Sequence, residues 1–184
     1  MSLDVSVNRI LKLMGNRFEF TVIAEDDSLG NEAIDAAVDE VRRIENLLTT
    51  FKDSSETNQV NEHAGLKPFK VSAEVFTLIE RAIKISSITD GAFDLTYGSI
   101  DKSLWNFDLN MKTLPDASLA KESVGLIDYQ NIVLDKDKST VFLKNKGMRI
   151  GFGGIGKGYA ADMAKKVLQN FGIRAGIVNA AGDL

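Results

Sequence analysis

A glycine-rich stretch late in the chain is the segment best suited to chemistry. Residues 151–158 read Gly-Phe-Gly-Gly-Ile-Gly-Lys-Gly. Glycines let a ligand approach the backbone closely, and the first N–H groups of a helix that follows such a loop can bind an anion. Lys157 adds a positive charge at the same place. The stretch therefore indicates a site for a phosphate or diphosphate group.

Three interpretations of this stretch compete. The glycines at its first, third and sixth positions match the spacing of dinucleotide-binding loops, but the acidic residue that such loops need about 20 positions further on is not in place, since Asp183 lies too far along the chain. A P-loop is the second pattern, and it fails because Gly158 stands where a Ser or Thr hydroxyl should meet magnesium. The third interpretation is a glycine turn that only lets a helix pack against a sheet.

A second candidate is the Gly-Ala-Phe-Asp-Leu-Thr segment at residues 91–96. The carboxylate of Asp94 could accept hydrogen bonds from sugar hydroxyls. In the structural alternative, a helix ends here, Phe93 lies in the core and Asp94 caps the next turn. Taken alone, the segment favours the structural alternative. Trp105 is expected to be a core residue or part of a pocket wall.

The composition excludes several classes of site. The chain has no cysteine, so disulfides, thiolate zinc sites and cysteine nucleophiles are excluded. Its one histidine, His63, cannot form a multi-histidine metal site, and we expect a solvated loop residue there, with a general base as the alternative. The formal net charge of -4 gives no electrostatic reason to expect a nucleic acid as partner. No leader segment and no apolar run long enough to span a bilayer is evident.

Periodicity predicts mixed strands and helices, in an α+β or α/β arrangement. The predicted strands are 18–24, 131–135, 140–143, a strand end at 149–150, and 175–180. The predicted helices are 31–51, a helix capped by Ser72, and 159–171 with Gly172 closing it. The polar residues 52–67 show neither the alternation of a strand nor the spacing of three to four of a helix. They are predicted to form a long loop.

Five short segments, in order along the chain, together resemble the FAD:protein FMN transferase (ApbE) family. They are Leu-Met-Gly at 13–15, the Leu-Leu-Thr-Thr-Phe, Ser-Glu and Val-Asn pieces of 47–61 (similar to SELSRLN), 91–96 (similar to GAFDPT), Gly-Gly-Ile-Gly-Lys-Gly-Tyr at 153–159 (similar to GGIAKGY) and Asn-Ala-Ala-Gly-Asp at 179–183 (similar to NAGGD). Each segment alone is weak, but their shared order over nearly the whole chain is specific. The resemblance displaces the P-loop and dinucleotide interpretations.

The resemblance implies an enzyme that binds FAD and a divalent metal ion, usually Mg2+. Such an enzyme transfers FMN to a Thr or Ser hydroxyl of a partner flavoprotein subunit and releases AMP. It also implies an α+β fold, with a mixed or antiparallel sheet, packed helices and a T-fold-related architecture. Full-length relatives are expected to be periplasmic or membrane-anchored. The residues implied to contact FAD are Met14, Phe51, Ala92, Phe93, Asp94 and Lys157, and the residue implied to give its carbonyl to the metal is Gly154.

Two departures from the family pattern stand out. Gly151 occupies a position where the family commonly has an aspartate, so one implied FAD contact is absent. The family's later segments, which carry metal-binding side chains, do not occur in the 184 residues. We therefore expect residues 1–184 to be the N-terminal part of a single ApbE-like catalytic domain whose C-terminal segment is missing. No catalytic residue is assigned.

Two other functions fit the same residues. A FAD pyrophosphatase would use water in place of the protein hydroxyl and give FMN and AMP. A non-catalytic FAD- or nucleotide-binding fragment would bind without cleaving. AMP release would rule out the binder, and free FMN rather than acceptor-bound FMN would favour the pyrophosphatase.

Overall fold

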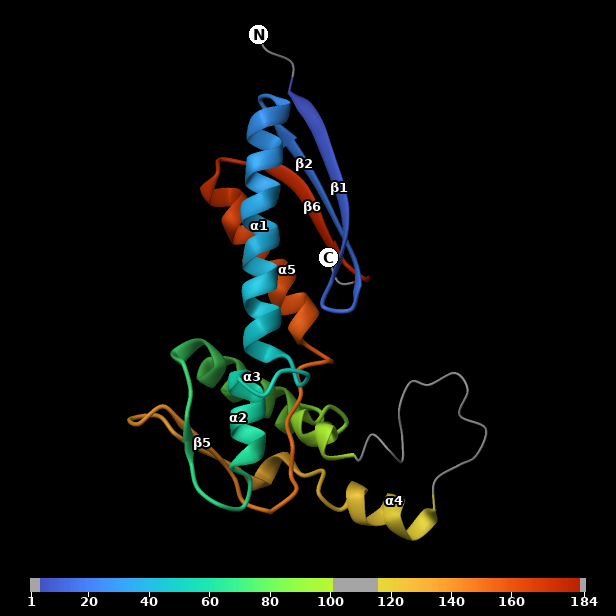
Figure 1. Cartoon of the computed structure of the whole chain (residues 1–184), viewed down its shortest axis with the longest axis vertical. Helices are drawn as coiled ribbons and strands as arrows, with labels where there is room; N and C mark the ends of the chain where they lie inside the picture. The colour runs from blue at the N-terminus through green and yellow to red at the C-terminus, as the bar shows by residue number, and fades with distance from the viewer. Residues whose placement is uncertain (1–3, 101–115, 183–184) are drawn as a thin grey trace. The chain divides into compact units, whose positions relative to one another are not determined.

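The computed structural model describes residues 4–100 and 116–182 of the chain (Figure 1). Trp105 and Asp183 lie outside these ranges, so the expectations for them are not addressed. The chain divides into two compact units: unit 1 comprises Met1–Leu47 and Gly153–Leu184, and unit 2 comprises Leu48–Phe152. Each unit is described by itself.

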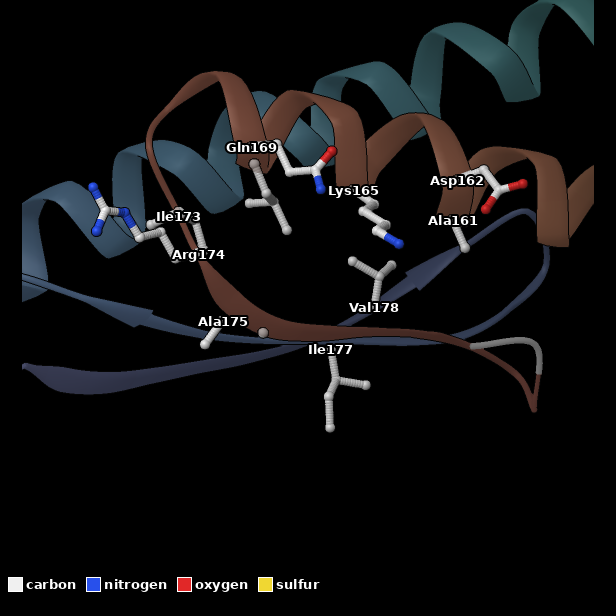
Figure 2. A pocket seen from close by; sticks show the side chains of 11 residues that line it. Ala161, Asp162, Lys165, Gln169, Ile173, Arg174, Ala175, Ile177 and Val178 are labelled. Atoms are coloured by element: carbon white, nitrogen blue, oxygen red, sulfur yellow. The ribbon is translucent and has the colours of Figure 1, made fainter.

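Unit 1 is a three-stranded antiparallel sheet with two helices on one face (Figures 1 and 2). The strand order is β1-β2-β6. The elements are β1 (Val5–Leu13), β2 (Asn16–Ala24), α1 (Asp27–Leu48), α5 (Gly156–Asn170) and β6 (Ala175–Ala180). The predicted strands 18–24 and 175–180 and the helices 31–51 and 159–171 are thus confirmed, with shifts of a few residues at their ends.

Apolar residues alternate with others along most of β2, and the lack of such an alternation in the sequence of β1 explains why β1 was not predicted. Phe18, Phe20 and Val22 are fully buried because every second side chain faces the helices. On β1 the same face carries Arg9, paired with Phe20 in the register and ion-paired with an α1 carboxylate. The opposite face carries Ile10, which is 51% exposed. A charge facing the helices and an apolar residue facing outward hide the period of a strand.

The end of α5 follows the sequence prediction closely. Gly172 has φ +82°, and its N–H donates to the carbonyl of Gln169 at 3.0 Å. The N–H of Ile173 donates to the carbonyl of Leu168 at 3.1 Å. A left-handed glycine with these bonds is a usual way to end a helix, so the expected role of Gly172 is confirmed.

Unit 2 combines short helices with a second antiparallel sheet of order β3-β5-β4. Its elements are α2 (Glu56–Glu62), β3 (Phe69–Lys70), α3 (Ala73–Ile88), the 3-10 helix η1 (Leu95–Ser99), α4 (Ala117–Val124), the 3-10 helix η2 (Tyr129–Asn131), β4 (Ile132–Asp135) and β5 (Thr140–Leu143). The predicted cap of α3 is confirmed, because Ser72 Oγ accepts from the N–H of Val75 at 3.3 Å. The predicted strands 131–135 and 140–143 pair as expected.

Two predictions of secondary structure in unit 2 are wrong. Residues 52–67 are not all loop, because α2 lies within them, capped by Ser55. Its buried residues include Thr57, Asn58 and Asn61, so no apolar period marks it. Residues 149–150 are not a strand end, because their backbone groups bond to side chains rather than to a neighbouring strand.

None of the helices within residues 4–100 and 116–182 combines the length and the low charge needed to cross a bilayer. The mixture of helices and antiparallel sheets confirms the expected α+β class.

Candidate functional site

The residues predicted to bind FAD or metal are divided between the two units. Met14, Gly154 and Lys157 belong to unit 1, whereas Phe51 and residues 92–94 belong to unit 2. The boundary falls inside the glycine stretch, after Phe152. The resemblance implies that residues of both units contact FAD, and this stays a prediction.

Met14 lies at the tip of the β1–β2 hairpin. Leu13 and Asn16 pair, so Met14 and Gly15 form a two-residue turn with φ +50° and +74°. Positive φ at both positions is the geometry of tight hairpins, which glycine adopts readily and methionine rarely. The sequence therefore places a half-buried methionine in a fixed, slightly strained conformation at this tip.

The unit 1 part of the glycine stretch leads directly into α5. Gly153 and Gly154 are exposed, and Ile155, the residue before the helix, makes no side-chain cap. A Cβ added at Gly158 would meet no atom within 4 Å, so close packing does not require a glycine there. Lys157 sits in the first turn. Close packing therefore does not account for Gly158, and ligand binding by this stretch stays a prediction.

Phe51 is 86% exposed. Its backbone N–H donates to Thr49 Oγ1 at 3.1 Å, which fixes the turn that carries it. Single exposed apolar residues are common, but a ring this open to solvent suits the predicted contact with a planar ligand.

The 91–96 loop is held by its own carboxylate. Asp94 Oδ1 accepts from the N–H of Thr96 at 2.7 Å and from its hydroxyl at 2.6 Å, and Oδ2 accepts from the N–H of Tyr129 at 2.9 Å. The Thr96 hydroxyl in turn accepts from the N–H of Asp128 at 2.9 Å. The capping role proposed for Asp94 is thus confirmed. Ala92 is exposed, and Phe93 is half-buried rather than in the core.

A third set of contacts, not predicted from the sequence, holds the segment before the glycines. Asn61 Oδ1 accepts from the N–H of Ile150 at 2.7 Å, and its Nδ2 donates to the carbonyl of Ile150 at 3.1 Å. Ser99 Oγ accepts from the N–H of Arg149 at 2.9 Å and donates to its carbonyl at 3.2 Å. The N–H of Gly151 donates to the carbonyl of Leu95 at 3.0 Å.

The Arg149 guanidinium is oriented by an amide. It donates to Asn58 Oδ1 at 3.1 Å, and Asn58 Nδ2 donates to the carbonyl of Lys52 at 3.0 Å. The signal that could have revealed this helix face is the spacing of Ser55, Asn58 and Asn61, three residues apart.

Tyr97 lines the space beside Gly151. A Cβ added at Gly151 would lie 3.3 Å from the Tyr97 hydroxyl oxygen, and the tyrosine is 44% exposed. The missing side chain at 151 therefore leaves room that a tyrosine partly occupies.

His63 differs from expectation. It is half-buried at the end of α2, where Nδ1 lies 2.7 Å from the carbonyl of Gln59 and the ring lies 5.0 Å from that of Phe69. The polar segment around it folds into a helix, so the histidine is packed rather than solvated.

No metal centre is evident in the part of the chain that the structure describes, since no three His, Cys, Asp or Glu side chains gather there. One carboxyl in unit 2 has a shifted pKa. The hydrogen bond from the Lys138 ammonium lowers the pKa of Asp135 in the β4–β5 hairpin.

A pocket of about 320 Å³ lies between α5 and β6 (Figure 2). Leu168 and Val178 contribute apolar walls, and Lys165, Asp162 and Arg174 contribute charged groups. None of the residues predicted to bind FAD lines it.

Comparison with known protein families decides the assignment. The family model described as ApbE family matches residues 14–184. The chain belongs to the ApbE family. It is 31% identical over 172 residues to the FAD:protein FMN transferase of Klebsiella pneumoniae (strain 342), covering 94% of this chain and 53% of that protein. It is 29% identical over 160 residues to the protein of the same name from Treponema pallidum (strain Nichols), covering 82% and 44%.

Solved ApbE structures share the fold. The ApbE protein of Thermotoga maritima superposes with a TM-score of 0.81 at 26% identity, over 91% of this chain and 53% of its own. The flavin transferase ApbE from Vibrio cholerae gives a TM-score of 0.82 at 23% identity, over 97% and 58%. The ApbE-like α+β architecture expected from the sequence is confirmed. The chain spans about half the length of the curated ApbE relatives it matches.

Proposed function

We propose that this chain is the FAD-binding N-terminal part of an FAD:protein FMN transferase. The observation that carries the proposal is the match to the Klebsiella pneumoniae transferase, which extends over 94% of the chain. The open glycines before α5 and the exposed ring of Phe51 are consistent with a site for a flavin and a diphosphate.

In this proposal the chain binds and orients the substrate. The first N–H groups of α5 and the Lys157 ammonium would face the diphosphate, where positive partial and full charges stabilise charge that develops on phosphoryl oxygens. Phe51 and residues 92–94 would contact the flavin end, and Met14 would line the pocket. Glycines at 153 and 154 would let the backbone approach the ligand closely.

The proposed reaction is a phosphoryl-type displacement. A Thr or Ser hydroxyl of a partner flavoprotein attacks the phosphorus on the FMN side of FAD. A new P–O bond joins FMN to the acceptor, the P–O bond to the AMP phosphate breaks, and AMP leaves while the hydroxyl proton passes to solvent or base. Catalysis of such transfers depends mainly on positioning and on neutralising charge.

The described residues do not make a magnesium site on their own. Mg2+ prefers near-octahedral oxygen coordination, and these ranges offer the predicted Gly154 carbonyl but no cluster of carboxylates. We therefore assign no step to the metal, and the role of Gly154 as a ligand stays a proposal.

The test is to incubate the chain with FAD, MgCl2 and a threonine-bearing flavoprotein acceptor. Covalent flavin on the acceptor together with AMP release supports the transferase. Free FMN with AMP would instead indicate a pyrophosphatase. Absence of FAD binding would overturn the proposal.

A second candidate is a FAD binder that does not cleave its ligand. Tight FAD binding without AMP release from this 184-residue chain would support it, and any AMP release above the FAD-only control would exclude it.

A further inference from the structure

The segment Arg149–Gly151 is fixed by side chains rather than by a sheet. Its neighbours are α2 on the one hand and η1 on the other, and all of them lie in unit 2. We infer that Asn61 and Ser99 are positioning residues, which hold this segment so that the glycines following it present their backbone to the nucleotide. The identity of the ligand, FAD, rests on the proposed function.

Asn61 acts as a neighbouring strand would. A side-chain amide offers a carbonyl acceptor and an N–H donor, as a peptide group does. Asn61 uses both with the same residue, Ile150. Asn61 is 5% exposed and Ile150 is fully buried. Without the amide, two backbone groups would be left unpaired in the interior, and buried groups of this kind are costly.

Ser99 performs the same function one residue earlier. Its hydroxyl both accepts from the N–H of Arg149 and donates to the carbonyl of that residue. The η1 turn also lies tightly against the segment, because a Cβ at Gly98 would come within 3.1 Å of the Ile150 carbonyl carbon. Little free space remains there for the segment to shift.

Successive backbone groups are thereby fixed: N–H and C=O of Arg149, N–H and C=O of Ile150, and N–H of Gly151. Gly153 follows two positions later. Glycines have the largest conformational freedom of any residue, so the short connection 153–155 before α5 benefits from a rigid attachment point. Fixing that point lowers the entropic cost of ordering the loop around a ligand.

The inference also gives a physical role to the end of one family-like segment and to a residue that follows another. Asn61 ends the 55–61 segment, and Ser99 follows shortly after the 91–96 segment. Both would act on the nucleotide through the backbone of residues 149–151, without touching it.

The experiment compares Asn61→Ala and Ser99→Ala with Ser86→Ala. Ser86 is a matched control: it is fully buried in the same unit, and its hydroxyl donates to a carbonyl within α3, at Ala82, 3.1 Å away. Each protein is measured for melting temperature, for FAD affinity by flavin fluorescence, and for hydrogen exchange of the 153–158 amides.

We expect Asn61→Ala to weaken FAD binding about 10-fold or more and Ser99→Ala to weaken it several-fold, since misplacing a binding group by about 1 Å can cost up to about 100-fold. Exchange at 153–158 should accelerate in both. Ser86→Ala should leave affinity and loop exchange unchanged, whatever its effect on the melting temperature, because the Ala82 carbonyl keeps its helical backbone partner. Ser99→Thr, which keeps the hydroxyl, should recover most of the affinity.

The inference is overturned if Asn61→Ala and Ser99→Ala lower the melting temperature but bind FAD as tightly as the unmodified chain does. In that outcome their amides at 153–158 would also exchange at the unmodified rate. Should Asn61→Ala fail to fold, Ser99→Ala and Asn61→Asp, which keeps the acceptor for the Ile150 N–H, carry the comparison. If the unmodified chain does not bind FAD, the proposed function fails, and the exchange data alone decide whether Asn61 and Ser99 position the loop.

Discussion

The two units fix their backbones by different means. In unit 1, β2 is held by a register with two neighbouring strands and by side chains such as Phe18 and Phe20 that alternate into an apolar core. In unit 2, the segment 149–151 has no strand partner and is held by Asn61, Ser99 and a carbonyl of η1. An apolar core tolerates changes that keep volume, whereas a bonded polar contact depends on individual atoms. The two regions should therefore respond differently to mutation.

The largest effect is expected from opening the unit 1 core. Phe20→Ala should destabilise the protein by about 3–5 kcal/mol, because it removes a fully buried ring and leaves a cavity. Ile23→Ala changes a residue on the opposite face of the same strand that is 36% exposed, and it should cost about 1 kcal/mol or less. Urea unfolding of both variants measures the difference, and equal losses would contradict the assignment of the sheet faces.

The next largest effect should come from the Asp94 contacts in unit 2. Asp94→Ala removes the acceptor for Thr96 and for the N–H of Tyr129, and should cost about 2–3 kcal/mol, since hydrogen bonds to charged groups contribute about 1.5–3 kcal/mol. Asp137→Ala, at an exposed position of the β4–β5 turn, is the control and should change stability by less than about 0.5 kcal/mol. If Asp94 acts only as a FAD contact, its removal would lower affinity and leave unfolding unchanged.

The same contrast explains what the sequence could and could not predict. β2, α3 with its Ser72 cap, the β4–β5 hairpin and α5 follow from local patterns: a period of two or of three to four, a hydroxyl before a helix, and Gly172 after one. β1 was missed because Arg9 faces the helices and Ile10 faces outward. A local pattern cannot show that an inward-facing charge has a partner on α1.

α2 and the contacts of 149–151 were missed for a related reason. The side chains that define them are polar, and their partners are distant in sequence: Asn61 and Ile150 are 89 positions apart. Buried asparagines look like loop residues until their partners are known. The family resemblance placed Met14, Phe51, Ala92–Asp94, Gly154 and Lys157 at the candidate site, and their contacts with FAD remain predictions.

A charge at the start of α5 should affect binding more than stability. Lys157→Gln is expected to weaken FAD binding about 10-fold, because it removes a charged partner of the diphosphate worth about 1–2 kcal/mol. Lys165→Gln changes an exposed lysine further along the same helix and should leave affinity unchanged. The difference should shrink as salt is raised. Equal affinities for the two variants would argue against a diphosphate at the helix start.

The smallest effect concerns Gly151, which lies one residue before the end of unit 2. Its added Cβ would lie 3.3 Å from the Tyr97 hydroxyl, a contact that a small movement of the half-exposed ring can relieve. Gly151→Ala should therefore cost no more than about 1 kcal/mol.

Combining Gly151→Ala with Tyr97→Ala tests the origin of that cost. Removing the ring takes away the crowded atom, so the double variant should be more stable than the sum of the single effects predicts, and a double-mutant cycle measured by urea unfolding gives the coupling. Strict additivity would show that there is no energetic coupling between positions 97 and 151. The segment would then be fixed by its hydrogen bonds alone, as the contacts of Asn61 and Ser99 suggest, and Gly151 would owe its identity to something other than Tyr97.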